Sequence, residues 1–204
     1  MTGVRVPIRI LLPIALVVLL AGPASAASFD LERLLDDLAP ADGFLASEYV
    51  ETRASGLLTE EVQVHGHIEY RSPGELEKTE QRDDEERTVT IREGTVRLET
   101  AEETRTFPLT RSRQLTALMD LLEAVATGDA DLLREAFESD LDGDPDAWRL
   151  RLRARRGGGG SGEGADARPL RLEVTGDDIG IEYIRLESSE AGRLTLELLR
   201  DADA

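Results

Sequence analysis

Two histidines have a spacing that could support metal chemistry. His65 and His67 flank Gly66, so on a β-strand both imidazoles lie on the same face, as two ligands of a zinc site can. They are the only histidines in the chain, cysteine is absent, and the polar face of this strand should contact water. A solvated strand face is therefore the favoured interpretation, and we predict no metal site.

Three alternating aspartates resemble the start of a calcium-binding loop. Asp140, Asp142 and Asp144 have the spacing of its first ligands. However, Pro145 occupies the position that requires glycine, and Arg151 occupies the position of the bidentate glutamate. These residues are better interpreted as an acidic hairpin turn.

No motif for catalysis is present in the sequence. It contains no nucleophile elbow, phosphate-binding loop or dinucleotide fingerprint, and the four glycines at 157–160 do not join a strand to a helix. The carboxylates are spread along the chain, and no pair is surrounded by apolar residues as general acid–base catalysis requires. We therefore expect a protein that is not an enzyme and that needs no cofactor.

The N-terminus has the pattern of a secretory signal peptide. Arg5 and Arg9 precede an apolar run at 10–20, and the small residues Ala-Ser-Ala follow at 24–26. An uncleaved membrane anchor is the less favoured alternative, because these 11 residues are fewer than the roughly 20 that span a bilayer. We predict a signal peptide at 1–26, a single domain at 27–204 and a periplasmic location.

The charge of the chain limits its partners. Lysine and arginine total 24 against 42 acidic residues, a net charge of −18, and loss of Arg5 and Arg9 with the signal peptide leaves 22 − 42 = −20. Such a protein is repelled by nucleic acids and by anionic membrane surfaces. We expect neither as a direct partner, and we expect a monomer.

Hydrophobic periodicity predicts a mainly β (α+β) domain. Apolar residues at helical spacing predict three helices, within 30–38, 115–125 and 129–136. Alternating apolar residues and turn signals predict hairpins and closing strands at 62–80, 89–98, 137–152, 170–174, 179–186 and 194–198. The segment at 156–168 is rich in glycine and lacks large apolar residues, so we predict a flexible loop.

One stretch resembles a known family. The run at 66–76, Gly-His-Ile-Glu-Tyr-Arg-Ser-Pro-Gly-Glu-Leu, with Tyr49 and Glu51 upstream and the turn at 91–94 downstream, resembles the outer-membrane lipoprotein carrier protein (LolA) family. The stretch at 115–137 and the strand starting at Trp148 are similar to a divergent branch of that family. The resemblance extends from about residue 44 to 199.

The resemblance implies a strongly curved, incomplete antiparallel β-barrel. Its apolar concave face is covered by short lid helices, which leaves a cavity for acyl chains. Implied partners are an acylated lipoprotein or lipid cargo, an inner-membrane ABC transporter that releases it, and an outer-membrane acceptor. The residues expected to bind lipid in the cavity and lid are Val64, Ile68, Tyr70, Ile91, Leu115, Leu118, Met119, Leu122, Trp148, Leu150 and Leu152.

One position departs from the family pattern. The family often has arginine directly before the proline of the strand turn, where it bonds to the lid. Here that position is Ser72, and Arg71 lies one residue earlier, on the opposite face of the strand. The lid contact that this arginine makes in the family is therefore in question for this chain.

The sequence predicts a periplasmic carrier that ferries acyl chains from the inner to the outer membrane. A soluble carrier of lipid must be exported and must lack an anchor, and the absence of cysteine excludes lipidation on an N-terminal cysteine. The alternative is a periplasmic structural or interaction protein with a filled barrel core and no lipid cargo. Lipid bound to the native protein distinguishes the two.

The signal peptide predicts a defined mature end. Cleavage after Ala26 makes Ala27 the first residue of the exported protein. Intact mass spectrometry of exported protein should give the mass of residues 27–204. A mass that includes residues 1–26 contradicts the prediction.

Overall fold

The computed structural model describes residues 29–54, 61–82, 85–155, 170–188 and 192–199. The predicted signal peptide, its cleavage site and the glycine-rich loop at 156–168 lie outside these residues. None of the described helices is long and apolar enough to span a membrane.

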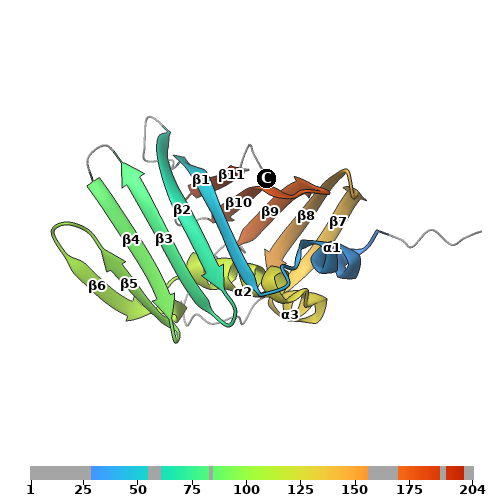
Figure 1. Cartoon of the computed structure of the whole chain (residues 1–204), viewed down its shortest axis with the longest axis horizontal. Coiled ribbons are helices and arrows are strands. Elements are labelled where there is room, and N and C mark those ends of the chain that lie inside the picture. Colours follow the sequence, from blue (N-terminus) through green and yellow to red (C-terminus); the bar gives the residue numbers. More distant parts are fainter. Residues whose placement is uncertain (1–28, 55–60, 83–84, 156–169, 189–191, 200–204) are drawn as a thin grey trace, which may run out of the picture.

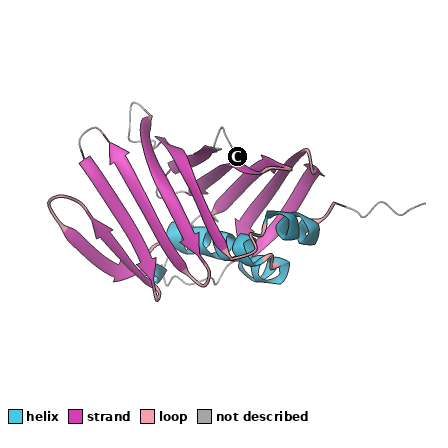
Figure 2. Ribbon diagram, viewed as in Figure 1, coloured by secondary structure: helices cyan, strands magenta, loops and turns pink. Residues whose placement is uncertain are grey.

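A single antiparallel sheet of 11 strands forms most of the described structure (Figures 1 and 2). Its spatial order is β6-β5-β4-β3-β2-β1-β11-β10-β9-β8-β7, and β6 and β7 are its two edges. The strands are β1 (Phe44–Ala54), β2 (Val62–Arg71), β3 (Glu75–Arg82), β4 (Glu85–Arg92), β5 (Thr95–Glu99), β6 (Thr104–Pro108), β7 (Phe137–Asp144), β8 (Ala147–Ala154), β9 (Arg171–Asp177), β10 (Gly180–Ser188) and β11 (Gly192–Leu199). The predicted mainly β fold is confirmed.

The sheet curves around its helices. Figure 1 shows β1–β6 on one side and β7–β10 on the other, with α2 between them along the lower part of the strands. The helices are α1 (Leu31–Leu38), α2 (Arg113–Thr127) and α3 (Ala130–Ala136), and the 3-10 turn η1 (Leu109–Arg111) leads into α2. Because the edge strands β6 and β7 do not pair with each other, the barrel is incomplete.

Local side-chain caps and a glycine define the ends of the helices. Asp30 accepts a hydrogen bond from the backbone N–H of Arg33 at the start of α1, and Asp129 caps α3 in the same way. The α2 helix ends at Gly128, whose φ of 68° is left-handed.

The inner face of the sheet is apolar because inward and outward residues alternate along each strand. The register places Leu150, Val174, Ile184 and Leu196 side by side across four neighbouring strands, β8 to β11. All four are buried, and they belong to the same hydrophobic cluster as the inner face of α2.

Gly66 allows one aromatic ring to lie flat across β2. Its register partner is Tyr49, whose hydroxyl donates to the carbonyl oxygen of Thr79 on β3 at 2.9 Å. A Cβ on Gly66 would lie 2.0 Å from that carbonyl oxygen and 2.4 Å from the Tyr49 hydroxyl. Glycine is therefore required here for a tyrosine that links three strands.

Two strands were not predicted from the sequence. β1 has polar residues at several positions, and its inner face includes Glu51. β6 is a short edge strand with largely exposed side chains. Neither has the clean alternation of apolar and polar residues that identifies a strand.

Candidate functional site

The residues predicted to bind lipid lie in one apolar cluster, except Val64, which is buried outside it. The sheet contributes Ile68, Tyr70, Ile91, Trp148, Leu150 and Leu152 to the cluster, and α2 contributes Leu115, Leu118, Met119 and Leu122. All are at most 8% exposed except Leu115, which is partly buried. In this conformation α2 and the concave face share a packed core, so an acyl chain can reach these residues only if the helix moves.

A polar contact fastens α2 to the turn between β2 and β3. Glu123 of α2 accepts hydrogen bonds from the hydroxyls of Tyr70 and Ser72 and from the backbone N–H of Gly74. The Ser72 Oγ–Glu123 Oε1 distance is 2.9 Å, and the Gly74 N–Glu123 Oε2 distance is 3.1 Å. We call this group, Tyr70, Ser72, Gly74 and Glu123, the helix latch.

The helix latch uses the position at which the family often has arginine. Ser72 is a short donor, and the long acceptor Glu123 reaches it from the helix. Burial and then the hydrogen bond to Glu123 raise the pKa of Tyr70, so its hydroxyl keeps its proton and remains a donor at neutral pH. Arg71 lies on the outer face, with its guanidinium carbon 4.5 Å from the centre of the Phe44 ring.

A group of charged side chains interrupts the apolar concave face. Lys78 Nζ lies 2.5 Å from Glu51 Oε2 and 2.6 Å from Glu80 Oε1. Arg53 pairs with both carboxylates, at 2.6 Å from its Nη2 to Glu80 Oε1. Arg87 Nη1 lies 3.9 Å from Glu80 Oε2. We call Glu51, Arg53, Lys78, Glu80 and Arg87 the inner charge cluster.

The inner charge cluster keeps its charges because they compensate each other. Burial alone favours the neutral form of Lys78, but the attraction of Glu51 and Glu80 outweighs it, and the pKa of Lys78 is raised. Burial likewise opposes ionisation of Glu80, yet Lys78 and Arg53 hold its pKa below the usual range. Burial raises the pKa of Tyr49, beneath the ammonium group, to about 12.

This cluster could not be predicted from the sequence alone. The interpretation that no acidic pair lies in apolar surroundings was wrong, because Glu51 is 0% and Glu80 6% exposed. The feature that indicates the cluster is the alternation along β3, which places Leu76, Lys78 and Glu80 at successive inward positions. Lys78 is also the only lysine in the chain.

The motifs considered for metal binding lie on the outer face. His67 contacts Glu48 at 2.9 Å and Glu69 at 3.1 Å, while the side chain of His65 is exposed. Asp140 and Asp142 both pair with Arg151. In the part of the chain that the structure describes, no three histidine, aspartate or glutamate side chains come together as metal ligands.

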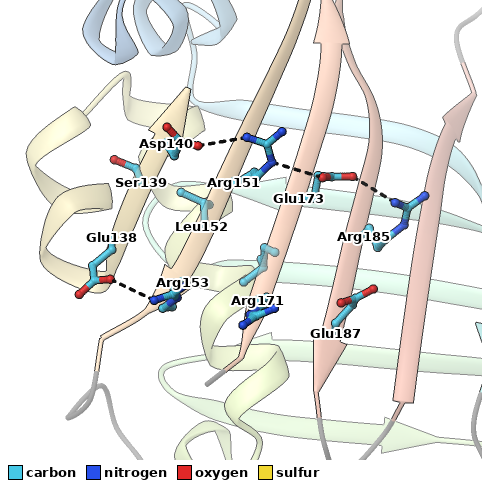
Figure 3. A pocket seen from close by; sticks show the side chains of 11 residues that line it. Glu138, Ser139, Asp140, Arg151, Leu152, Arg153, Arg171, Glu173, Arg185 and Glu187 are labelled. Carbon is cyan, nitrogen blue, oxygen red and sulfur yellow. Dashed lines mark hydrogen bonds and ion pairs between the residues drawn. The ribbon is translucent and has the colours of Figure 1, made fainter. Parts of the chain in front are cut away.

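A pocket of about 540 Å³ lies on the outer face of β7–β10 (Figure 3). Arginine and acidic side chains alternate across it, and Glu173 contacts both Arg151, at 3.8 Å, and Arg185, at 3.1 Å. Four arginines and four acidic residues line it, so its formal charges balance.

A family model described as outer membrane lipoprotein carrier protein LolA-like matches residues 23–172. The chain belongs to this LolA-like family. The match spans 150 of 204 residues and includes both the helix latch and the inner charge cluster. No match was found among the curated proteins.

Three solved structures are similar to this LolA-like protein at low identity. A LolA superfamily protein from Nitrosomonas europaea is 9% identical, with a TM-score of 0.42 and coverage of 84% of this chain and 92% of that one. A DUF1329 family protein from Desulfovibrio piger is 12% identical, with a TM-score of 0.42 and coverage of 86% and 92%. LprF from Mycobacterium bovis is 10% identical, with a TM-score of 0.36 and coverage of 87% and 95%.

Removal of Lys78, the cation at the centre of the inner charge cluster, should destabilise the protein. Lys78→Met removes the buried cation that pairs with both Glu51 and Glu80, so we expect the unfolding free energy at neutral pH to fall by about 3–5 kcal/mol. The lowered pKa of Glu80 contributes stability that is lost as the pH falls through its folded-state value. The difference in unfolding free energy between wild type and Lys78→Met should therefore become smaller as the pH falls below about 4.5.

Chemical denaturation at neutral and acid pH measures both effects. The control is Arg97→Met, a change at an exposed arginine that contacts only Glu99 among the described residues, which should have little effect. A Lys78→Met protein as stable as wild type at neutral pH contradicts the prediction.

Proposed function

We propose that this protein is a periplasmic carrier of acyl chains, which it binds between the concave face and α2 and ferries from the inner to the outer membrane. Membership of the LolA-like family is the observation that carries the proposal. The apolar concave face and the helix lying against it support it. The cargo is the acyl chains of a lipoprotein or of another lipid.

The physical need for such a carrier is large. Each methylene removed from water contributes about 0.8 kcal/mol, so a chain of about 15 methylenes favours an apolar site over water by roughly 12 kcal/mol. An acyl chain therefore does not leave a membrane unassisted on a useful timescale. A protein that replaces the contacts of its own lid by contacts to the chain can compensate for this cost.

The α2 helix is suited to act as the lid. Its inward residues are apolar, so the surface that it covers can accept hydrocarbon in its place. The helix contacts the sheet through apolar packing, which has no preferred direction. In addition, Glu123 accepts three hydrogen bonds from the residues of the β2–β3 turn. Loss of the hydrogen bonds of Glu123 would therefore release the C-terminal end of α2 from the turn.

Family membership and the predicted signal peptide support the proposed route. An inner-membrane ABC transporter would release the cargo to this protein, and an outer-membrane acceptor would take it. The net charge of −18 disfavours adsorption to anionic membrane, which suits transfer through protein partners. The protein acts without catalysis or a cofactor, as a monomer.

The alternative is a structural or interaction protein in which the same side chains form a permanent core. The burial of the predicted lipid-binding residues is the observation that favours it. The two proposals differ in whether hydrocarbon can enter between α2 and the sheet. Trp148 can report this, because it is the only tryptophan and lies on the concave face at 4% exposure.

An acyl chain in the cavity should quench the emission of Trp148. We expect stearate brominated at mid-chain, added below its micelle concentration, to quench saturably, because bromine quenches indole at contact. Unbrominated stearate is the control for conformational change. Saturable quenching by the brominated chain alone supports the carrier, and unchanged emission supports the permanent core.

Loss of the helix latch should speed acyl entry. Glu123→Ala removes the acceptor of three hydrogen bonds, so we expect stability to fall by about 1–3 kcal/mol and the rate of quenching by brominated stearate to rise several-fold. Stopped-flow fluorescence and thermal unfolding measure the two effects.

The control for the latch is Glu135→Ala, which changes an exposed glutamate on the neighbouring helix α3. This variant should bind at the wild-type rate. Destabilisation of Glu123→Ala without faster entry would show that Glu123 stabilises the fold and does not control the lid.

A further inference from the structure

The accessible part of the inner charge cluster is cationic. The side chains of Glu51 and Glu80 are 0% and 7% exposed, whereas those of Arg53 and Arg87 are 35% and 42% exposed. The carboxylates therefore lie behind the arginines. With three cations and two carboxylates the cluster has a net charge of +1, inside a chain whose net charge is −18.

Arg87 has unused hydrogen-bonding capacity. Its Nε is buried and has no hydrogen-bond partner in the described part of the chain. Among the described residues its closest carboxylate is Glu80, at 3.9 Å from Nη1, which is beyond hydrogen-bond distance. Glu80 already accepts shorter bonds from Lys78 and Arg53. The side chain as a whole is 42% exposed, so the terminal N–H donors of the guanidinium can still bind an oxyanion.

The cluster adjoins the apolar surface proposed for the cargo. Val89 is the next inward residue after Arg87 on β4, and Ile68 is the register partner of Lys78 on β2. Both are buried in the hydrophobic cluster. A charged group at the arginines and a hydrocarbon chain on this surface can therefore belong to one molecule.

The inner charge cluster and the helix latch lie at opposite ends of the same strands. β1 begins at Phe44 and β3 at Glu75, at the end of the sheet near the helices, and both strands run from there toward the inner charge cluster. Arg87 is the register partner of Glu80 and lies near the start of β4, at the cluster end. The helix latch lies at the β2–β3 turn, at the other end of these strands (Figure 1). A ligand can thus contact the arginines without displacing the latch.

We propose that Arg87 and Arg53 bind the phosphate headgroup of an anionic lipid whose acyl chain lies on the concave face. This rests on the proposed carrier function and adds a headgroup preference to it. Arg87 supplies the free donors, and Arg53, held by Glu51 and Glu80, supplies positive charge beside it. Free phosphate has the same recognition chemistry, and the experiment below separates the two sources.

The test compares two lipids that differ only in the phosphate. Oleoyl lysophosphatidic acid and monooleoylglycerol share one acyl chain, and both are titrated below their micelle concentrations by calorimetry, with inorganic phosphate as a third titrant. For wild type we expect lysophosphatidic acid to bind about tenfold more tightly than monooleoylglycerol, because of charge-assisted hydrogen bonds. We expect inorganic phosphate alone to bind far more weakly.

Arg87→Gln should remove most of this difference and leave the affinity for monooleoylglycerol unchanged. The matched control is Arg92→Gln, on the same strand but on the outer face, where the side chain is 64% exposed. It should keep the tenfold preference. Arg87→Lys, which keeps the charge but loses the planar fork, should keep part of it and also tests the site should Arg87→Gln be unstable.

The outcomes distinguish the headgroup site from the carrier function. Equal affinity for the two lipids overturns the headgroup site and leaves the carrier standing. No binding of either lipid overturns the carrier function itself. A preference that persists in Arg87→Gln overturns the assignment to Arg87, and phosphate binding as tight as that of the lipid assigns the site to the free anion.

Discussion

The fold depends on burial of the concave face of its sheet. An 11-stranded antiparallel sheet with one apolar face cannot remain open to water, and because β6 and β7 do not pair, closure of the barrel does not hide that face. The α2 helix covers it instead, and the sheet curves around the helix (Figure 1). The helix is thus at once a part of the core and a candidate lid, and its packing limits both stability and access.

Charge has two separate roles in this molecule. On the outer face, arginine and acidic side chains alternate across β7–β10 in exposed pairs that contribute little each. On the inner face, Lys78 is enclosed by Glu51 and Glu80, and the opposite charges of these buried groups compensate one another. The first arrangement keeps an acidic surface locally balanced, and the second fixes β1, β3 and β4 relative to one another.

Much of the fold could be predicted from the sequence, and the exceptions have a common cause. The helix caps Asp30 and Asp129 and the hairpin at Ser72 follow from local chemistry, and so does the apolar alternation from Trp148 to Leu152. The inner charge cluster combines residues that are 27 positions apart in the chain, Glu51 with Lys78, so only the register of the sheet brings them together. The helix latch is similar, since a glutamate on an amphipathic helix gives no sign that it contacts the turn before Gly74.

The order of strands has a consequence for how the chain reaches this structure. β1 is near the N-terminus, yet it lies in the middle of the sheet, and one of its two neighbours is β11, the last strand. Glu48 and Leu199 are register partners, so this ladder forms only after almost the whole chain has emerged. Until then β1 presents an unpaired backbone edge, and the slowest folding contacts are also those that join the two halves of the sheet. A chain that leaves a ribosome or a translocation channel from its N-terminus therefore completes its centre last.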